Sequence, residues 1–458
     1  MNRVFINRTM NLKQINAIGF DMDHTLVRYY NDSFEELAFG FIVQKLVDSF
    51  HYPESIKKFK FKYDLAIRGL VIDQKSGMLL KLDRFRHIHS SFQGTRPVPY
   101  RELRKNYSDR MIEPSDPRFV SIDTTFIISV TSVYMQLVDL KIANKEVLPD
   151  FEAMASDVIT AMDQAHGDGS LKEVVAKNLE KYIRKEPEVA LGLERMKKHD
   201  KFLFIITNSE YEYAKTLLEY AIDPFLKEHD SFKDLFDLII VGAQKPRFFQ
   251  DSLRLMEVNP ETGSLTNHFG MMKPGIFQGG HARQFEEDFG FQPHEILYMG
   301  DHIYGDILRL KKDRGWRTGL ILEELDHEIQ NLVQASSVDA QINKLMKEKE
   351  SFEQQIQALE SEQIENSNRR HKVKINSLFE KMRKIDDTLR NLILKSASYF
   401  NPNWGPIMRS GNMESYYAHQ VIRFADIYMA ELSALTNLSP RSYLRAGRRL
   451  LPHEEIET

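Results

Sequence analysis

Short apolar runs that end in polar residues recur along the chain and predict buried parallel strands. The first is Ile15–Phe20, followed at once by Asp21, and the others fall within residues 201–210, 237–246, 295–303 and 317–324. Continuous apolar runs are typical of strands buried on both faces, and here the polar residues fall at their carboxyl ends. Helical stretches such as 211–226 separate the runs. We therefore predict a doubly wound, Rossmann-like α/β sheet with its ligand crevice at those carboxyl ends.

A long interval separates the first two predicted strands. It spans roughly 180 residues, far more than a connection within a compact fold needs. We expect an inserted domain there, beginning with a helix over 33–50 and a hairpin over 68–85 that turns at Lys75-Ser76-Gly77. From about His89 to Lys177 the pattern predicts mostly helix. We interpret the insert as a cap over the crevice.

After Leu325 the apolar pattern changes to a spacing of three or four residues. Two such stretches, separated by the polar run ENSNRR, predict an antiparallel helical hairpin. The first stripe contains Ile342, Leu345, Phe352, Ile356 and Leu359, and the second Ile375, Leu378, Met382, Ile385, Leu389 and Leu392. Such a stripe serves packing or self-association far more often than cofactor binding.

Four segments follow from this pattern. Residues 1–90 hold the first part of the core, and residues 91–177 form the cap. Residues 178–335 complete the core, and residues 336–458 form the hairpin and C-terminal helices that pack on it.

Composition narrows the class of protein. The chain has 458 residues, 42% hydrophobic and 28% charged, with a formal net charge of -4 and no cysteine. A near-neutral charge gives no reason to expect nucleic acid as a partner, and no apolar stretch approaches the roughly 20 residues that span a bilayer. Disulfides and thiol chemistry are excluded. The polar N-terminus is not a secretory signal, so we expect a cytoplasmic protein.

The residues after the first strand are the first candidates for chemistry. Positions i and i+2 of an extended segment point to the same side, so the carboxylates of Asp21 and Asp23 can converge, with Thr25 next in line. An isolated D-x-D is ordinarily a solvated turn. Taken alone, the pair leaves open both that turn and a site for a cation and a phosphate.

The second strand ends in Thr207-Asn208-Ser209, which suits phosphate binding. A hydroxyl and backbone N–H groups there hold phosphate oxygens without adding charge. The alternative is a helix N-cap by Ser209, with Glu212 completing a capping box. The two interpretations are compatible, because a helix N-terminus is itself an anion site.

The third and fourth strands supply a cation and two more acids. Lys245 is either a surface charge or the neutralising partner of the carboxylates and a phosphate. Asp301 and Asp306, in GDHIYGD, add oxygen ligands of the kind that Mg²⁺ prefers. The four predicted strand ends carry, in order, D-x-D-x-T, T-N, K-P and G-D-x-x-x-x-D. Four such motifs in this order would rarely occur by chance.

These motifs resemble the haloacid dehalogenase (HAD) superfamily of aspartate-nucleophile phosphotransferases. The resemblance implies Asp21 as nucleophile and Asp23 as general acid/base, which argues against a dehalogenase. It also implies catalytic roles for Thr207 and Lys245, and phosphate contacts from Thr25, Asn208 and Ser209. Mg²⁺ is the implied cofactor. Its implied ligands are the Asp21 side chain, the Asp23 backbone carbonyl and Asp301, with Asp306 acting through water or from outside the direct ligands.

The match narrows to one family. The stretches FDMDHTLVRY, TNSEYEY, QKPRFF, LYMGDHIYGDILRLKKDRGWRT and HQVIRFADIYMAELSAL resemble the cytosolic IMP/GMP-specific 5′-nucleotidase II family, over about Ile15 to His453. The resemblance implies hydrolysis of purine nucleoside 5′-monophosphates through an aspartyl-phosphate. Capture of the same intermediate by a nucleoside would add phosphotransferase activity.

The resemblance also implies substrate contacts in the cap. These residues are Phe126, which would stack on the base, and Asp163, His166 and Lys172, near base and phosphate. Ordinary helix packing is the alternative for Phe126 and His166. Ile127 and Ile159 stand where the family has asparagine and arginine, which leaves the preferred purine open.

Partners and rival functions complete the expectations. We expect a purine nucleoside monophosphate as substrate and a homo-oligomer, either dimer or tetramer. A nucleotide effector is a further partner that the resemblance raises, since Lys312 matches although Glu113–Arg118 aligns poorly. Two rivals stay open: a phosphatase for another phosphometabolite, because the core motifs do not read the leaving group, and a catalytically idle scaffold.

Overall fold

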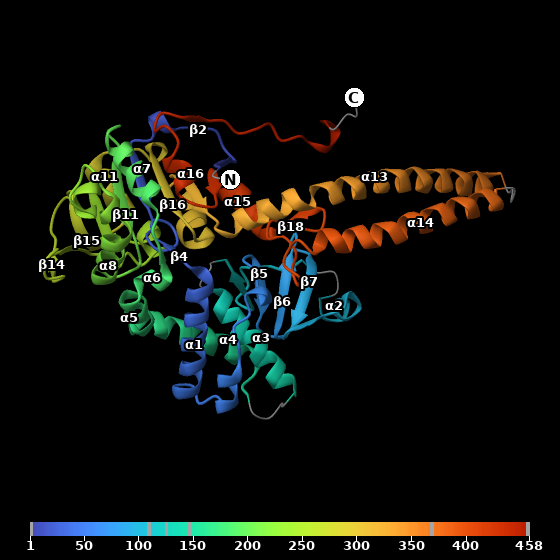
Figure 1. The fold of residues 1–458 in the computed structure, drawn as a ribbon, viewed down its shortest axis with the longest axis horizontal. Helices are drawn as coiled ribbons and strands as arrows, with labels where there is room; N and C mark the ends of the chain where they lie inside the picture. The colour runs from blue at the N-terminus through green and yellow to red at the C-terminus, as the bar shows by residue number, and fades with distance from the viewer. Residues whose placement is uncertain (1–2, 108–110, 124–126, 144–147, 367–370, 455–458) are drawn as a thin grey trace. The chain divides into compact units, whose positions relative to one another are not determined.

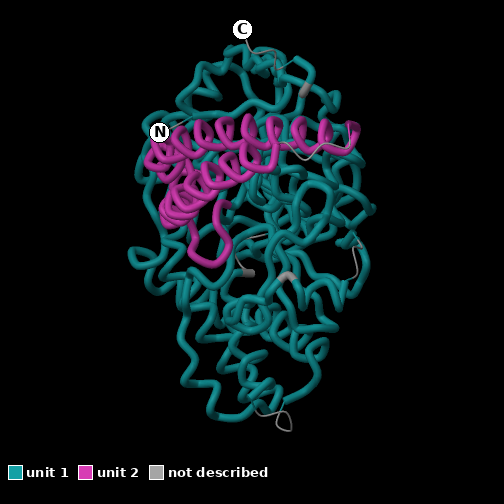
Figure 2. The backbone as a smooth tube through the Cα atoms, turned by 90° about the vertical axis from the view of Figure 1, so that its right-hand side faces the viewer, with its two compact units in different colours: residues 1–324, 407–458 teal, residues 325–406 magenta. Residues whose placement is uncertain are grey.

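The computed structural model describes residues 3–107, 111–123, 127–143, 148–366 and 371–454. The chain divides into two compact units (Figure 2). The first comprises Met1–Glu324 with Ile407–Thr458, and the second comprises Leu325–Pro406. The predicted segment 336–458 therefore spans both units.

A ten-stranded sheet lies at the centre of the first unit, among the residues described (Figure 1). Its parallel part runs in the order β20 (Ile427–Met429), β17 (Arg317–Ile321), β16 (Ile296–Gly300), β3 (Ala17–Phe20), β11 (Phe202–Ile206), β12 (Leu238–Val241) and β15 (Gly275–Gly279). Antiparallel strands extend both edges, β1 (Phe5–Ile6) beside β20 and the pair β13 (Leu255–Val258) and β14 (Leu265–Asn267) beside β15.

The strand order confirms the prediction of a doubly wound α/β sheet. From β3 the chain proceeds outward through β11, β12 and β15, and then returns to β16 on the other side of β3. Because parallel crossovers are right-handed, this reversal sends the helices of the two halves to opposite faces. The helices are α7 (Pro187–Lys197), α8 (Tyr211–Ala221), α9 (Phe232–Leu235), α10 (Arg247–Gln250), α11 (Ala282–Phe289) and α12 (Arg309–Asp313). The switch point of the sheet lies at β3, where such folds bind ligands.

Close packing fixes β3 in the sheet. All four of its residues are buried, and a Cβ added to Gly19 would lie 2.2 Å from the ring of Phe204 on β11. Phe204 in turn packs against Phe285 of α11, with ring centroids 4.6 Å apart, and against the edge of Trp316. Close packing of this kind leaves the strand little room to move. The residues that follow β3 therefore begin from a fixed backbone position.

The insert comprises residues 30–182 and has paired ends. The chain enters it through β4 (Arg28–Tyr29) and leaves it through β10 (Ile183–Arg184), and these two strands pair antiparallel. Arg28 on this neck is buried, and its guanidinium contacts Glu186 at 2.7 Å, Glu431 at 2.8 Å and Glu323 at 3.3 Å. The Arg28 guanidinium thereby links the neck, by ion pairs, to the residues that follow strands β17 and β20 of the central sheet.

The insert contains an antiparallel sheet as well as helices. The predicted hairpin is present as β5 (Leu70–Asp73) and β6 (Met78–Leu82), within the order β8-β7-β6-β5-β9. The prediction of mostly helix from His89 is wrong up to Ile122, where the chain forms β7 (Ile88–Gln93), β8 (Arg96–Pro97) and β9 (Phe119–Ile122) around helix α2 (Tyr100–Tyr107). Pairing with the buried strands β5 and β6, over a separate apolar cluster that includes Val71, Leu80 and Leu103, outweighs local helical pattern here.

Helices make up the rest of the insert. They are α1 (Asn31–Asp48), α3 (Ile127–Ala143), α4 (Phe151–Gly167), α5 (Ser170–Lys177) and α6 (Leu179–Tyr182). Helix α1 packs against both α3 and α4. After the second unit the chain adds α15 (Tyr416–Phe424), β20 and α16 (Ser433–Thr436) to the first unit.

The second unit is the predicted helical hairpin. Helices α13 (Glu324–Glu365) and α14 (Lys372–Ala397) pack through Ile356, Ile375 and Leu378, at positions of the predicted stripes. An ion pair between Lys349 and Asp386, at 2.7 Å, links the two helices. No helix among the described residues is long and apolar enough to cross a membrane.

One buried acid in α1 has an altered proton affinity. Glu35 is fully buried, and its Oε2 accepts the N–H of Ser129 in the first turn of α3 at 2.8 Å. Burial raises the pKa of Glu35 to about 8. The side chain is therefore a neutral acid at pH 7 in the folded protein, whereas in the unfolded chain it ionises near its ordinary value.

This difference predicts a specific dependence of stability on pH. Because the folded pKa of Glu35 lies above the unfolded one, its contribution to the free energy of unfolding is complete below about pH 4.5 and is lost as the pH rises toward 8. The loss amounts to roughly 1.4 kcal/mol per pH unit. Glu35→Gln carries no titrating proton, so its urea-unfolding free energy should fall less steeply between pH 5.5 and 7.5 than that of the parent. Glu36→Gln, on the exposed side of α1, is the control, and parallel slopes for parent and Glu35→Gln would contradict the assignment.

Candidate active site

The nucleophile predicted from the sequence lies directly after β3. The N–H of Asp21 donates to the carbonyl of Met299 on the neighbouring strand β16 at 2.8 Å. The N–H of Met22 donates to Oδ1 of Asp21 at 2.7 Å and orients the carboxylate. Burial raises the pKa of Asp21 to about 7, against the opposing effect of Lys245. A carboxylate that is buried yet oriented in this way needs a nearby positive charge to stay ionised.

Lys245 supplies that charge. Its Nζ lies 2.8 Å from Oδ1 of Asp21 and 2.7 Å from Oδ1 of Asp306, and it donates to the hydroxyl of Tyr298 at 3.1 Å. Burial alone would lower the pKa of Lys245, but Asp21 and Asp306 raise it well above its usual value. The lysine is therefore a buried cation, and its interpretation as a surface charge is wrong.

The loop after β11 positions this lysine. Oδ1 of Asn208 accepts the backbone N–H of Lys245 at 2.6 Å, and Nδ2 of Asn208 donates to the carbonyl of Lys245 at 3.2 Å. These two hydrogen bonds join the polar ends of β11 and β12. Asn208, predicted to bind phosphate through its amide, therefore also holds the backbone of Lys245.

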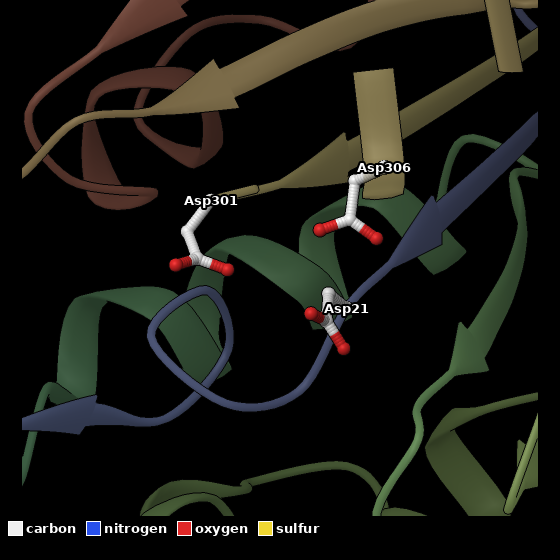
Figure 3. A group of neighbouring side chains, drawn as sticks. All are labelled: Asp21, Asp301 and Asp306. Carbon is white, nitrogen blue, oxygen red and sulfur yellow. The ribbon is translucent and has the colours of Figure 1, made fainter. Parts of the chain in front are cut away.

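Figure 3 shows the side chains of Asp21, Asp301 and Asp306 as close neighbours. Asp21 follows β3, Asp301 follows β16, and Asp306 lies in the π-helical turn η6 (Ile303–Leu308); each offers an oxygen within 4.8 Å of the others. Burial raises the pKa of Asp301 well above its ordinary value, although Arg68 opposes the shift. Oδ2 of Asp301 is buried with no hydrogen-bond partner among the described residues. An orphaned carboxylate oxygen in a set of three acids fits a divalent cation with oxygen ligands such as Mg²⁺.

A glycine makes room for one of these acids. A Cβ added to Gly300, the last residue of β16, would lie 2.5 Å from Cβ of Asp306. The N–H of His302 donates to Oδ2 of Asp306 at 3.2 Å. This hydrogen bond closes the turn between Asp301 and Asp306. Because a side chain at position 300 would collide with Asp306, glycine there lets Asp306 reach Lys245.

Asp23 is held apart from the other acids by two hydroxyl groups. Tyr29 donates to Oδ1 of Asp23 at 2.6 Å, and Ser209 donates to Oδ2 at 2.7 Å. The N–H of Ser209 in turn donates to Oγ1 of Thr207 at 3.0 Å. Ser209 is not the cap of α8, because Glu210 occupies the N-cap position without a side-chain hydrogen bond. As an N-cap the Ser209 oxygen would accept a backbone N–H of α8, whereas here its hydroxyl donates to Asp23.

A cavity of about 430 Å³ is lined both by this cluster and by residues of the insert. Its walls contain the predicted residues Asp21, Asp23, Thr207, Asn208, Ser209, Lys245, Asp301, Asp306, Asp163, His166 and Lys172. Burial lowers the pKa of His166 to about 4, so this imidazole is neutral, and burial raises the pKa of Asp163. The structure therefore brings core and insert candidates into one space.

Other predicted positions lie elsewhere. Thr25 is buried, and it is not among the residues that line the cavity. Ile159 does line the cavity. Phe126 lies outside the described residues, and Ile127 is the first residue of α3.

Sequence reasoning missed several residues of the site. Tyr29, Tyr213, Phe34, Val130 and His302 also line the cavity. Arg68 is fully buried and donates to the carbonyl of Asp301 at 2.8 Å and to Oε1 of Glu324 at 3.1 Å. Tyr29 and Tyr213 lie within the motifs FDMDHTLVRY and TNSEYEY, so these motifs could have pointed to both residues. Nothing in the sequence marks Arg68 as part of the site.

The doubly wound core and its acid–lysine cluster fit the phosphoryl-transfer chemistry that the motifs predict. Residues 4–456 match the model of the 5' nucleotidase family. The chain belongs to that family and is a phosphoric monoester hydrolase.

Relatives that the chain matches over most of their length agree with this assignment. A 5'-nucleotidase domain-containing protein of Dictyostelium discoideum is 28% identical over 98% of this chain and 74% of its own length. The human and rat proteins called 5'-nucleotidase domain-containing protein 2 are each 27% identical over 98% of this chain, covering 85% and 80% of their lengths. A solved structure titled as a predicted phosphoglycolate phosphatase from Haemophilus somnus 129pt has 15% identity and a TM-score of 0.28, covering 67% of this chain and 85% of that one. A score that low does not establish a shared fold.

The close approach at Gly300 predicts a sensitive substitution. Gly300→Ala places a methyl group against Cβ and Cγ of Asp306. Because these atoms lie close to the backbone and cannot swing away, the substitution should displace the Asp306 carboxylate from Lys245. We expect phosphatase turnover to fall by roughly 100-fold, the effect of misplacing a catalytic group by about 1 Å. The control is Gly40→Ala in α1, where a Cβ meets no atom within 4 Å. Equal activity of the two variants in a phosphate-release assay would refute the role given to Gly300.

Proposed function

We propose that the protein is a Mg²⁺-dependent 5′-nucleotidase that hydrolyses purine nucleoside 5′-monophosphates of the IMP/GMP type. The observation that supports this proposal is the continuous cavity. Its lining combines Asp21, Lys245 and the other acids of the core with insert residues that include His166 and Lys172. We infer that the phosphate binds beside the core acids and Lys245, and that the nucleoside contacts the insert residues.

Asp21 begins the reaction. Its carboxylate attacks phosphorus in line, a bond forms between Asp21 and phosphorus, and the bond from phosphorus to the 5′-oxygen breaks. Asp23 gives its proton to the departing 5′-oxygen. In the second half, Asp23 takes a proton from the water that displaces phosphate from Asp21, which restores both residues.

Charge at phosphorus is balanced by groups already in place. Lys245, the Thr207 hydroxyl and the N–H of Asn208 would contact the transferred oxygens. The N–H of Ser209 donates to Oγ1 of Thr207 and would act through that hydroxyl. Asp21, the backbone carbonyl of Asp23 and Asp301 would hold Mg²⁺, with Asp306 acting through water or from outside the direct ligands; the ion when bound offsets phosphate charge. Because these groups are fixed before substrate arrives, little reorganisation is needed during the transfer.

The insert end of the cavity suits a purine nucleoside. Ile159 and Val130 give it apolar wall, while Lys172, Asp163 and the neutral His166 provide polar contacts. Phe126 is proposed to stack on the base. A nucleoside in the same space, present when Asp21 carries the phosphoryl group, would receive it instead of water and give phosphotransferase activity.

Regulation, assembly and location extend the proposal. Lys312, whose Nζ lies 5.4 Å from the ring centroid of Phe424, is proposed to contact a nucleotide effector. We also propose a homo-oligomer in the cytoplasm. Exposed apolar side chains on α13 and α14, such as Val333 and Val373, support self-association, and the lack of cysteine fits a reducing compartment.

A substrate panel tests the function directly. Purified protein should release phosphate from IMP and GMP faster than from AMP, pyrimidine monophosphates or sugar phosphates, and only with Mg²⁺ added. Asp21→Asn should lose activity on every substrate by several orders of magnitude, as expected when a nucleophile is removed. A preference for a sugar phosphate would favour the rival phosphatase, and inactivity on the whole panel would favour the idle scaffold.

The metal site predicts a second variant. Asp301→Asn keeps the shape of the side chain but removes one of three carboxylate charges near the cation position. The Mg²⁺ concentration for half-maximal activity should rise by at least roughly tenfold. Asp288→Asn, on α11 and not among the residues that line the cavity, serves as control. An unchanged Mg²⁺ titration of Asp301→Asn would remove Asp301 from the metal ligands.

A further inference from the structure

We propose that Tyr29 and Tyr213 form a directional pair of hydroxyls that positions Asp23 for proton transfer. The inference rests on the proposed function, because it concerns the acid/base of that reaction. Neither tyrosine follows from the strand-end motifs, and both line the cavity.

The two hydrogen bonds to Asp23 fix its carboxylate at both oxygens. Tyr29 donates to Oδ1 at 2.6 Å, and Ser209 donates to Oδ2 at 2.7 Å. With one donor on each oxygen, rotation of the carboxyl group breaks both bonds at once. Each oxygen keeps a second lone pair, so the group remains able to carry the proton of the reaction.

The direction of the tyrosine pair follows from counting protons. The hydroxyl oxygens of Tyr29 and Tyr213 lie 3.0 Å apart. Tyr29 has a single hydroxyl proton, which it gives to Asp23, so Tyr213 must be the donor in the second bond. A tyrosine hydroxyl is protonated at neutral pH, so each of the two has one proton to donate.

Packing holds Tyr29 in place without substrate. Tyr29 belongs to β4 of the neck, and its ring stacks on that of His24 at 4.5 Å and meets the edge of Phe34 at 4.9 Å. Tyr213 comes from α8, and Nζ of Lys172 lies 5.4 Å from the centroid of its ring. The hydroxyl array thus joins the neck of the insert to a core helix, and it is assembled before substrate binds.

The hydrogen bonds from Tyr29 and Ser209 assist the step in which Asp23 protonates the leaving oxygen more than they assist other steps. When Asp23 transfers its proton to the 5′-oxygen as the bond from that oxygen to phosphorus breaks, a carboxylate is left behind. The hydrogen bonds from Tyr29 and Ser209 are stronger to that charged form. Tyr29 therefore favours protonation of the leaving oxygen and has little effect on a leaving group that departs without a proton.

The test compares leaving groups in Tyr29→Phe, which retains the ring and its packing. Single-turnover release of the first product is measured with IMP, whose alkoxide needs a proton, and with p-nitrophenyl phosphate, whose phenolate does not. We expect release from IMP to slow by roughly 100-fold, a typical size for general acid catalysis, and release from p-nitrophenyl phosphate to change by less than about threefold. Tyr213→Phe should show the same selectivity to a smaller extent, and Tyr30→Phe, at an exposed neighbour, should show neither change.

The outcomes separate the inference from the function on which it rests. Equal slowing with both substrates would mean that Tyr29 only supports the fold, and no slowing with IMP would mean that it does not act on Asp23; either result overturns the inference while the parent enzyme still hydrolyses IMP. If the parent releases phosphate from no nucleotide, the proposed function fails and the inference falls with it.

Discussion

The ion pairs of Lys245 are the interaction on which the site depends. Three carboxylates within 4.8 Å of one another would repel strongly in a buried crevice, and the lysine contacts two of them directly. Its own position comes from Asn208, which bonds the lysine backbone on both its N–H and carbonyl sides. The neighbouring strand therefore fixes the cation, and the cation makes the acidic cluster tolerable.

Much of the fold and the core of the site could be predicted from the sequence, for a physical reason. In a parallel sheet, residues at carboxyl ends lie on one edge, so a linear pattern of buried runs followed by polar residues already places Asp21, Lys245 and Asp301 together. The same period-based reasoning worked for the helices of the hairpin, whose stripe residues pack as expected. These features depend mainly on the local pattern of apolar and polar residues and on few contacts between distant parts of the chain.

What could not be predicted depends on tertiary contacts. The strands between His89 and Ile122 form because they pair with β5 and β6, and their own pattern is weak. Ser209 looked like a helix cap, yet it bonds Asp23 from far along the chain. Arg68 reaches the carbonyl of Asp301 across 233 positions of sequence, and no spacing rule relates the two.

The neck formed by β4 and β10 has a consequence for how this enzyme family can diversify. Because entry and exit of the insert pair with each other, the chain crosses between core and insert at one short ladder. An insert is in principle exchangeable there if a donor such as Arg68, which reaches the carbonyl of Asp301, is kept. The same ladder, however, carries Tyr29, whose hydroxyl reaches Asp23. An exchanged insert would bring a new substrate pocket, and it would keep the chemistry only if the tyrosine at its first boundary were kept with the core.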